Sequence, residues 1–328
     1  MTASDAPAGD PGPEAGPPPG IDGRTWHFRD FYGVGPQPDD DAAPLLVVHG
    51  NCQAEALRVV LAGSTDRFRT VRVPAVHELT AADVEPLQRL LARCDVLLSQ
   101  PVSTGYHDLP LGTADVRSAA PRARLVMFPV VRDSRLHPFQ ALVRVPAAGE
   151  PPVVPYHDLR TLALAASIDG SRTAAAPAGR PAVQADGVRE VARRSQAELA
   201  RRQREHGTIA VDDLLEAAGA EASHTLNHPG NPVLLGLARR VLDELDDDHE
   251  AIDPGRTLLR SVLSPLDADV LDALGLDPGR ARADWSVDGV PVPDETVVGE
   301  QLSWYGRHPD VVRAGLRRHG ATMEVLGL

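Results

Sequence analysis

The sequence predicts an α/β protein with a doubly wound, mostly parallel sheet and a mostly helical C-terminal part. Between residues 45 and 131, short apolar segments alternate with segments of helix-forming residues. Strands that are apolar along their whole length are typical of parallel sheets covered on both faces, and the intervening helices supply the covering layers. Beyond about residue 188, long helical patterns dominate the chain and predict the second part.

The first elements of the predicted sheet follow one another closely. LLVV (45–48) is the first strand, QAEALRVVLA (53–62) is a helix, and FRTVRVPAV (68–76) is the second strand. Thr80 and Asp83 then have the spacing of a capping box, in which each side chain bonds the other residue's backbone N–H. A helix is therefore expected to begin there.

The same alternation continues after that helix, which should end near Arg93. DVLLSQ (95–100) is the third strand, TADVRSAA (113–120) a helix, and ARLVMFPVV (123–131) the fourth strand. Repeated strand–helix–strand units of this length predict parallel neighbours joined by helical crossovers.

The second half of the chain has three strong helical patterns. A long polar helix is expected over 188–206, and shorter ones over 211–219 and 231–245. In the last of these, Asn231 is the expected N-cap and Pro232 occupies the first turn.

Composition divides the chain into three parts. Residues 1–44 are rich in Pro, Gly, Ala and Asp and are expected to form a disordered tail, although the aromatic patch Trp26–Tyr32 offers a way to pin its end onto the domain. Residues 45–150 form the sheet domain, and residues 151–328 the mostly helical part that covers the active edge. The segment 171–183 has the composition of a linker or exposed loop.

Charge and composition exclude several classes of function. The net charge of −13 disfavours binding to nucleic acid, whose phosphates would be repelled. All 33 basic residues are arginine, so a pyridoxal Schiff base and a Walker P-loop, which both need lysine, are excluded. The absence of a long apolar run and of a signal sequence, together with only two cysteines, predicts a soluble cytoplasmic protein without a membrane span.

The segment HGNCQ (49–53) follows the first predicted strand. It contains one of the two cysteines and one of only three asparagines in the chain. Ligands of open parallel sheets bind beyond the carboxyl ends of the strands, and Gly50 permits a tight turn there. Cys52 then lies at a helix N-terminus, where free N–H groups lower a thiol pKa, so it is a candidate nucleophile or part of an anion-holding loop. The alternative is a buried structural cysteine, which is also the expected role of Cys94.

Polar side chains also follow the third and fourth strands. Gln100 begins the loop SQPVSTGYHDLPLGT (99–113), and the segment RDSRLHPF (132–139) follows the fourth strand. The other two asparagines lie in SHTLNHPGN (223–231), where His228 is a candidate general base or a loop histidine that caps a helix. Several polar strand ends at one edge predict a binding pocket.

Five segments in this order resemble the WcbI family of polysaccharide biosynthesis proteins, which are regarded as acetyltransferases. They are GNCQ, SQPVSTGYHDLPLGT, the Arg/HP segment, PYHDL (155–159) and TLNHPGN (225–231), and the resemblance covers roughly residues 45–245. It implies a bacterial enzyme of capsule or exopolysaccharide assembly that binds coenzyme A as acetyl-CoA and transfers the acyl group to a sugar hydroxyl. No metal is implied.

The resemblance maps the family's first motif onto residues 50–53 and its Asn-His-Pro motif onto residues 227–229, and the polar loops after the third and fourth strands supply the other candidate residues. Cys52 and His228 are the expected catalytic residues. The expected substrate- and cofactor-binding residues are Gly50, Asn51, Gln53, Gln100, Tyr106, Arg132, Arg135, His137 and Asn227. Arg132 or Arg135 should contact the phosphates of coenzyme A, since guanidinium pairs with phosphate in a bidentate manner and lysine is absent.

Four other interpretations remain. An SGNH-type esterase would use Cys52 in the place of its serine, but Thr225, not aspartate, stands three residues before His228. Cys52 and Arg58 have phosphatase spacing, yet the intervening residues are strongly helix-forming. His224 and His228 have zinc-ligand spacing, but the sequence around Pro229 disfavours a helix. A saccharide- or coenzyme A-binding accessory protein would leave Cys52 inert. The arginines of 189–206 could meet a phosphate of coenzyme A, although a solvated helix face explains them better.

Overall fold

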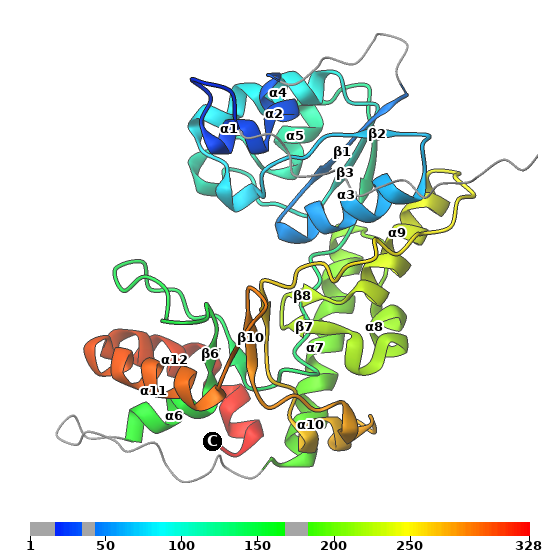
Figure 1. The fold of residues 1–328 in the computed structure, drawn as a ribbon. Coiled ribbons are helices and arrows are strands. Elements are labelled where there is room, and N and C mark those ends of the chain that lie inside the picture. Colours follow the sequence, from blue (N-terminus) through cyan, green and yellow to red (C-terminus); the bar gives the residue numbers. More distant parts are fainter. Residues whose placement is uncertain (1–16, 35–42, 168–182) are drawn as a thin grey trace, which may run out of the picture.

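A four-stranded parallel sheet forms the centre of the N-terminal part of the chain (Figure 1). The computed structural model describes residues 17–34, 43–167 and 183–328. The strands are β1 (Leu45–His49), β2 (Arg69–Thr70), β3 (Val96–Ser99) and β4 (Arg124–Met127), in the spatial order β2-β1-β3-β4. The order places β1 and β3 in the middle, and all pairs are parallel, as predicted.

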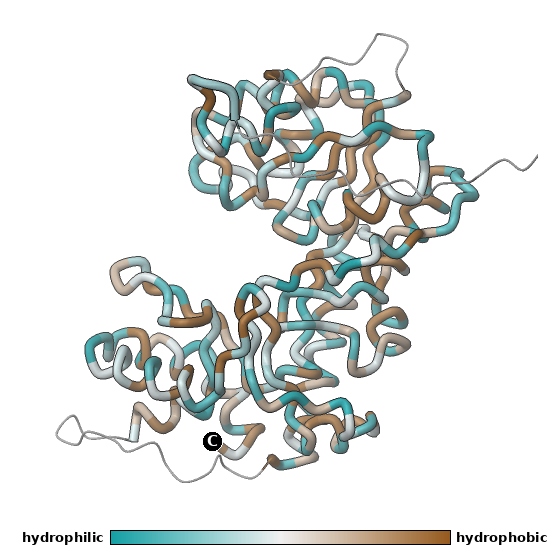
Figure 2. Tube along the Cα trace, in the orientation of Figure 1, coloured by the Kyte–Doolittle hydropathy of each residue, from teal (hydrophilic) through white to brown (hydrophobic). Residues whose placement is uncertain are grey.

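Helices cover both faces of this sheet. Leu46 and Val48 belong to a core shared with α3 (Cys52–Ser64) and α9 (Asn231–Glu244). Leu45 and Val47 point to the other face, where α4 (Val84–Ala92) and α5 (Thr113–Ala119) pack. Because successive side chains of a strand point to opposite faces, an apolar strand needs a helical layer on each side. The doubly wound α/β fold is confirmed, and Figure 2 shows the hydrophobic residues concentrated along the strands.

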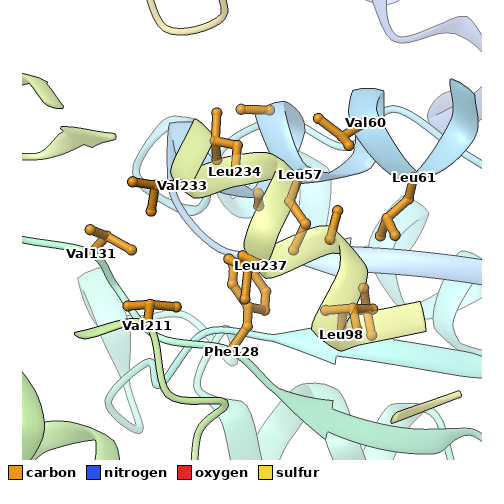
Figure 3. Close-up of a cluster of buried hydrophobic side chains, with 14 of the residues drawn as sticks. Leu57, Val60, Leu61, Leu98, Phe128, Val131, Val211, Val233, Leu234 and Leu237 are labelled. Atoms are coloured by element: carbon orange, nitrogen blue, oxygen red, sulfur yellow. The ribbon is translucent and has the colours of Figure 1, made fainter. Parts of the chain in front are cut away.

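The contact between α3 and α9 joins the two parts of the chain. Figure 3 shows Leu57 and Leu61 of α3 meeting Leu234 and Leu237 of α9, with Phe128 beneath them. All of these side chains are at most 2 % exposed. Burying an aliphatic side chain contributes about 1.5–3 kcal/mol, so this core fixes the C-terminal part against the sheet.

Two predicted strands are shorter than expected. The second pairs with β1 only at Arg69 and Thr70, and the fourth ends at Met127. Pro74 and Pro129 lie within the predicted segments. Because proline has no N–H to donate, the sheet ladder cannot continue through either position.

The C-terminal part is mostly helical and contains small antiparallel sheets. Its helices are α6 (Leu159–Ser167), α7 (Ala185–His206), α8 (Asp212–Ala218), α10 (Ala268–Ala273), α11 (Asp294–Arg307) and α12 (Pro309–Leu326). Its strand β6 (His157–Asp158) pairs with β5 (Gln140–Ala141), which comes from before the expected boundary at residue 150. The other pairs are β7 (Ser223–Thr225) with β8 (His228–Pro229), and β9 (Val262–Leu263) with β10 (Trp285–Val287), which also pairs with β11 (Val290–Val292). Short 3-10 turns occur at Val76–Glu78, Ala81–Asp83, Tyr106–Asp108, Gly219–Glu221 and Pro278–Arg280. In the described part of the chain, no helix has both the length and the apolarity to cross a membrane.

Residues 17–34 are folded, which corrects the expected disordered tail. They contain α1 (Gly23–His27) and α2 (Arg29–Tyr32), and Phe31 is buried in the core below α4. Asp83 accepts hydrogen bonds from Arg24 at 3.0 Å and from the Tyr32 hydroxyl at 2.6 Å. The aromatic patch therefore docks on the domain. Residues 1–16 and 35–42 of the expected tail lie outside the described residues, as does nearly all of the linker expected at 171–183.

One predicted helix cap is confirmed and another is wrong. The capping box of Thr80 and Asp83 is present. In α9, however, Gly230 is the N-cap and makes no side-chain cap, and Asn231 is already helical. The Asn231 amide instead accepts from the Leu258 N–H and donates to the Arg256 carbonyl, both at 2.9 Å.

Candidate functional site

The turn from β1 to α3 is built around Asn51. Its side-chain oxygen caps α3 by accepting from the Gln53 N–H at 2.9 Å, and its own N–H donates to Gln100 Oε1 at 2.9 Å. A Cβ on Gly50 would lie 2.5 Å from that same Gln100 oxygen, so a larger residue would displace the Gln100 side chain from its hydrogen bonds. The need for Gly50 thus comes from the close approach of Gln100, since its φ is not in the left-handed region.

The side chain of Gln53 forms hydrogen bonds to three loops and does not line the cavity. Its Nε2 donates to the carbonyls of Val131 at 2.7 Å and Asn227 at 2.8 Å. Its Oε1 accepts from the Val131 N–H at 2.9 Å and from Gln100 Nε2 at 3.1 Å. These four bonds use the whole amide, which is 2 % exposed. The expected binding role is therefore replaced by a positioning role, because Gln53 ties the ends of β1, β3 and β4 to the Asn227 loop.

A cavity of about 700 Å³ lies at the carboxyl edge of the sheet. Six of the predicted site residues line it: Asn51, Cys52, Gln100, Tyr106, Asn227 and His228. The rest of the lining includes His77, Tyr156 and Arg144, and a largely apolar stretch between residues 142 and 155. Residues far apart in the sequence therefore converge on one volume, large enough for a small-molecule ligand.

Cys52 is the first residue of α3 and is partly buried. Burial raises the pKa of the Cys52 thiol to about 11, although the N–H groups of Cys52 and Gln53 at the helix N-terminus act in the opposite direction. The predicted lowering of this pKa is therefore wrong, because the loss of hydration outweighs the helix terminus. The thiol is protonated near neutral pH.

His228 lines the same cavity from β8. Burial, with a smaller contribution from His224, lowers the pKa of His228 to about 4, so the ring is neutral near pH 7. Its Nδ1 is buried and has no hydrogen-bond partner among the described residues. No hydrogen bond joins His228 to Cys52 in the described part of the chain, so the two expected catalytic residues share a cavity without forming a preassembled pair.

Tyr156 is a site residue that was not singled out from the sequence. Its hydroxyl donates to Asn227 Oδ1 at 2.8 Å and lies 3.0 Å from Thr225 Oγ1. Its ring meets His228 edge-on, with the centroids 6.3 Å apart, and stacks on Trp285. Burial raises the pKa of Tyr156 to about 12, so the hydroxyl stays protonated and fixes the Asn227 amide. Its position in the PYHDL segment was the available signal.

The three candidate residues after the fourth strand, Arg132, Arg135 and His137, have different environments. Arg135 pairs with Asp133 at 2.8 Å and does not line the cavity. His137 is buried between the Ser223 carbonyl and the Ser264 hydroxyl, and burial lowers its pKa to about 3. Groups of the protein itself bind Arg135 and His137. We therefore replace the ligand-binding roles that were expected for these two residues by structural roles.

Arg132, like Arg135, does not line the cavity, but it differs from Arg135 because it lies in a cluster of arginines. Burial lowers its pKa, and the nearby charges of Arg318, Arg202 and Arg144 lower it further. No carboxylate within ion-pair distance of Arg132 occurs among the described residues. Arg144 lines the large cavity, and Arg202 lines a small adjoining cavity that shares Pro101 and Val130 with it. Arg202 has a carboxylate, Glu198, at 3.7 Å, but Arg132 itself is left without a counter-ion in a cluster where positive charge predominates.

The structure also bears on the phosphatase and zinc-site interpretations of the sequence and on the arginines of α7. Arg58 lies within α3 and pairs with Glu55 at 2.7 Å, so no phosphatase loop forms around Cys52. His224 and His228 lie on two antiparallel strands and not on one helix. Several arginines of α7, such as Arg193 and Arg201, pair with glutamates of the same helix, as a solvated face predicts. Cys94 is fully buried and its thiol donates to the Val96 carbonyl at 2.9 Å, which confirms its structural role.

Fold and site together define an α/β protein with a ligand cavity at the carboxyl edge of its parallel sheet. The family described as "Polysaccharide biosynthesis enzyme WcbI" matches residues 45–249, which is more than half of the chain. The chain therefore belongs to the WcbI family of polysaccharide biosynthesis enzymes.

A solved structure has the same fold over nearly its whole length. It is described as native WcbI, a polysaccharide biosynthesis enzyme, in a form without a disulfide bond between coenzyme A and one of that protein's cysteines. The TM-score is 0.72 at 19 % identity, and the match covers 87 % of this chain and 97 % of that one. No curated protein sequence matches the chain.

Proposed function

We propose that this protein is an acyltransferase that uses a coenzyme A thioester, in the first instance acetyl-CoA, to acylate a sugar hydroxyl during capsule or exopolysaccharide biosynthesis. The observation that carries the proposal is the convergence of Cys52, Asn227 and His228 on one cavity at the sheet edge. The related WcbI structure, whose description mentions coenzyme A and a cysteine, supports the same donor. Since acyl-CoA is a cytoplasmic metabolite, a cytoplasmic location is part of the proposal.

Arg132 is the proposed contact for the phosphates of the donor. Its guanidinium is partly buried beside Arg144, Arg202 and Arg318 without a carboxylate partner among the described residues. Bringing cations together costs free energy unless an anion neutralises them, and guanidinium groups bind phosphate with paired hydrogen bonds. Arg135 is not part of this contact, because Asp133 already neutralises it.

The environments of Cys52 and His228 favour direct transfer over an acyl-cysteine intermediate. A thiol whose pKa is about 11 is almost entirely protonated near pH 7, and the thiol form is a poor nucleophile. His228, by contrast, is unprotonated near pH 7 and has a lone pair for the sugar proton, although its pKa of about 4 makes it a weaker base than an ordinary imidazole. The sugar oxygen would bond to the thioester carbonyl carbon while its proton passes to His228. The carbon–sulfur bond then breaks, and His228 returns the proton to the leaving thiolate.

Two variants and one ligand measurement test this proposal. Mass spectrometry of small molecules that co-purify with the protein should detect coenzyme A or its acyl thioester. In a transfer assay with acetyl-CoA and acceptor glycans, His228→Ala should lose about 10²–10⁴-fold in rate, whereas Cys52→Ser should be only mildly impaired. Both variants should still bind coenzyme A in calorimetry.

Other outcomes select other mechanisms. Loss of transfer in Cys52→Ser, with trapping of an acyl group on Cys52 in His228→Ala, would replace direct transfer by covalent catalysis. Binding of coenzyme A or a glycan without turnover in the wild type would leave a non-catalytic binding protein. Hydrolysis of an acylated glycan without coenzyme A would favour an esterase.

A further inference from the structure

The β7–β8 hairpin separates two cavities. Asn227 and His228 line the large cavity described above. Ser223 and His224 of the same hairpin line a second cavity of about 440 Å³. The other walls of this second cavity come from the start of α9, from the segment around Thr257, and from Arg280 and Arg282. Three features of these walls favour an anion.

The first feature is the N-terminus of α9, a helix of 14 residues. Asn231 and Pro232 from its first turn line the second cavity. The N-cap Gly230 makes no side-chain cap, and the first turn has no acidic residue. Pro232 has no N–H, and the Val233 N–H donates to the Gly230 carbonyl at 3.1 Å. The Asn231 N–H and the partial positive charge of the helix end are therefore what this turn offers to an anion.

The second feature is Arg282. Its Nε donates to the Ser264 carbonyl at 2.9 Å, and its Nη2 bonds the same oxygen. No carboxylate within ion-pair distance of Arg282 occurs in the part of the chain that the structure describes. Burial lowers the pKa of Arg282, and no acidic group opposes that effect. A partly buried cation thus faces the cavity region without a counter-ion.

The third feature is an unused buried hydroxyl. Ser223 is 4 % exposed, and its Oγ has no hydrogen-bond partner among the described residues. Its neighbour His224 likewise has a buried Nε2 without a partner. A buried polar atom left without a partner costs roughly 1–3 kcal/mol, so such a group is usually explained by a ligand or an ordered water.

One of the two acidic residues of this cavity is paired, since Glu221 forms an ion pair with Arg280. Asp253 keeps its charge, because the Gly255 N–H that it accepts from at 2.8 Å is neutral, but it lies at the exposed rim, where water and salt screen it. Arg282 and the helix terminus therefore remain as the unneutralised positive charges of the second cavity.

We propose that this second cavity binds the phosphate or carboxylate group of a small molecule, held by the α9 N-terminus, Arg282 and the Ser223 hydroxyl. The volume exceeds that of an anion alone, which leaves room for the rest of the molecule. The site lies on the opposite side of the hairpin from Cys52 and His228, and it does not depend on the proposed acyl transfer.

The test is a titration of the full-length protein with inorganic phosphate, followed through the assigned ring ¹⁵N resonances of His224. These resonances should shift and saturate. Ser223→Ala should weaken phosphate affinity about tenfold, the usual loss for a hydrogen bond to a charged group. Arg282→Gln should weaken it at least as much. Ser223→Ala should melt no lower than the wild type, because its hydroxyl has no partner to lose, so weaker binding cannot come from unfolding.

Matched variants separate this site from the arginine cluster beside the large cavity. Arg132→Ala should leave the His224 titration unchanged, as should Arg313→Gln, which removes an exposed charge on α12. Parallel titrations with acetate and with glucose 1-phosphate distinguish a carboxylate from a phosphate ligand and a free anion from an anionic sugar. Absence of a saturable His224 shift with all three probes, or full affinity in both Ser223→Ala and Arg282→Gln, would overturn the proposal.

Discussion

The two cysteines lie at opposite ends of the same sheet. A comparison of their environments shows which features distinguish a ligand-binding site from a structural core. Cys94, just before β3, is 0 % exposed and donates its thiol to the Val96 carbonyl among apolar neighbours. Cys52, just after β1, lines a cavity together with Asn51, Gln100 and His228. Burial raises the pKa of both thiols to about 11.

The pKa of the thiol therefore does not distinguish Cys52 from Cys94. The residues that surround each thiol do distinguish them. The cluster around Cys94 is closed and apolar, so it contributes stability alone. The edge around Cys52 contains side-chain amides and a histidine that face a volume open to ligands. Functional character here is a property of the converging residues and not of the thiol by itself.

The largest expected effect is on the closed cluster. Phe31→Ala removes a side chain that is 3 % exposed from the same core as Cys94. Truncating a buried phenylalanine should lower the free energy of unfolding by about 3–5 kcal/mol. Urea denaturation measures this loss. Calorimetry at a temperature where the variant is folded should give wild-type affinity for coenzyme A. A large change in that affinity would show that the core around Cys94 and the cavity around Cys52 are not independent.

A second prediction concerns the pH dependence of stability at the cavity edge. The pKa of His228 is about 4 in the folded protein, against about 6.5 in the unfolded chain. Between these values the unfolded chain binds the proton and the folded protein does not, so lower pH favours unfolding. His228 should contribute a slope of about 1.4 kcal/mol per pH unit in this window, and none above it. Denaturation from pH 4 to 8 should show a shallower slope for His228→Asn than for the wild type.

A third prediction compares two arginines near the same strand end. Arg132→Ala should weaken coenzyme A binding about tenfold, or about 1.4 kcal/mol, because an unneutralised guanidinium is lost. Arg135→Ala should leave affinity unchanged, since that side chain serves Asp133. Calorimetry on both variants provides the measurement. Equal affinities in both variants and the wild type would remove the arginine cluster from the donor site.

Local patterns in the sequence were sufficient for the fold and for part of the site. Apolar strand segments predicted the doubly wound sheet, and the Thr80–Asp83 spacing predicted a capping box that is present. The sequence predicted a helix that begins at Gln53, and α3 begins one residue earlier, at Cys52. Each of these depends on residues within one or two turns of each other.

What the sequence could not provide depends on long-range packing. Tyr156 meets Asn227, and Arg132 lies near Arg202 and Arg318, only because distant segments fold together. The pKa of Cys52 was predicted with the wrong sign, because burial by residues far along the chain outweighs the local helix terminus.

The smallest expected effect is in thiol labelling, and it returns to the two cysteines. Because the pKa of both thiols is about 11, iodoacetamide should label each slowly near pH 7 and faster as the pH rises. Cys52 should still react several-fold faster than Cys94 at every pH, since it lines an open cavity and Cys94 is 0 % exposed. Mass spectrometry of tryptic peptides gives both rates in one sample, with Cys52→Ser as the control for peptide assignment. Bound coenzyme A should slow only Cys52. Equal rates for the two cysteines, or protection of Cys94 by coenzyme A, would contradict the distinction between an open polar edge and a closed apolar cluster.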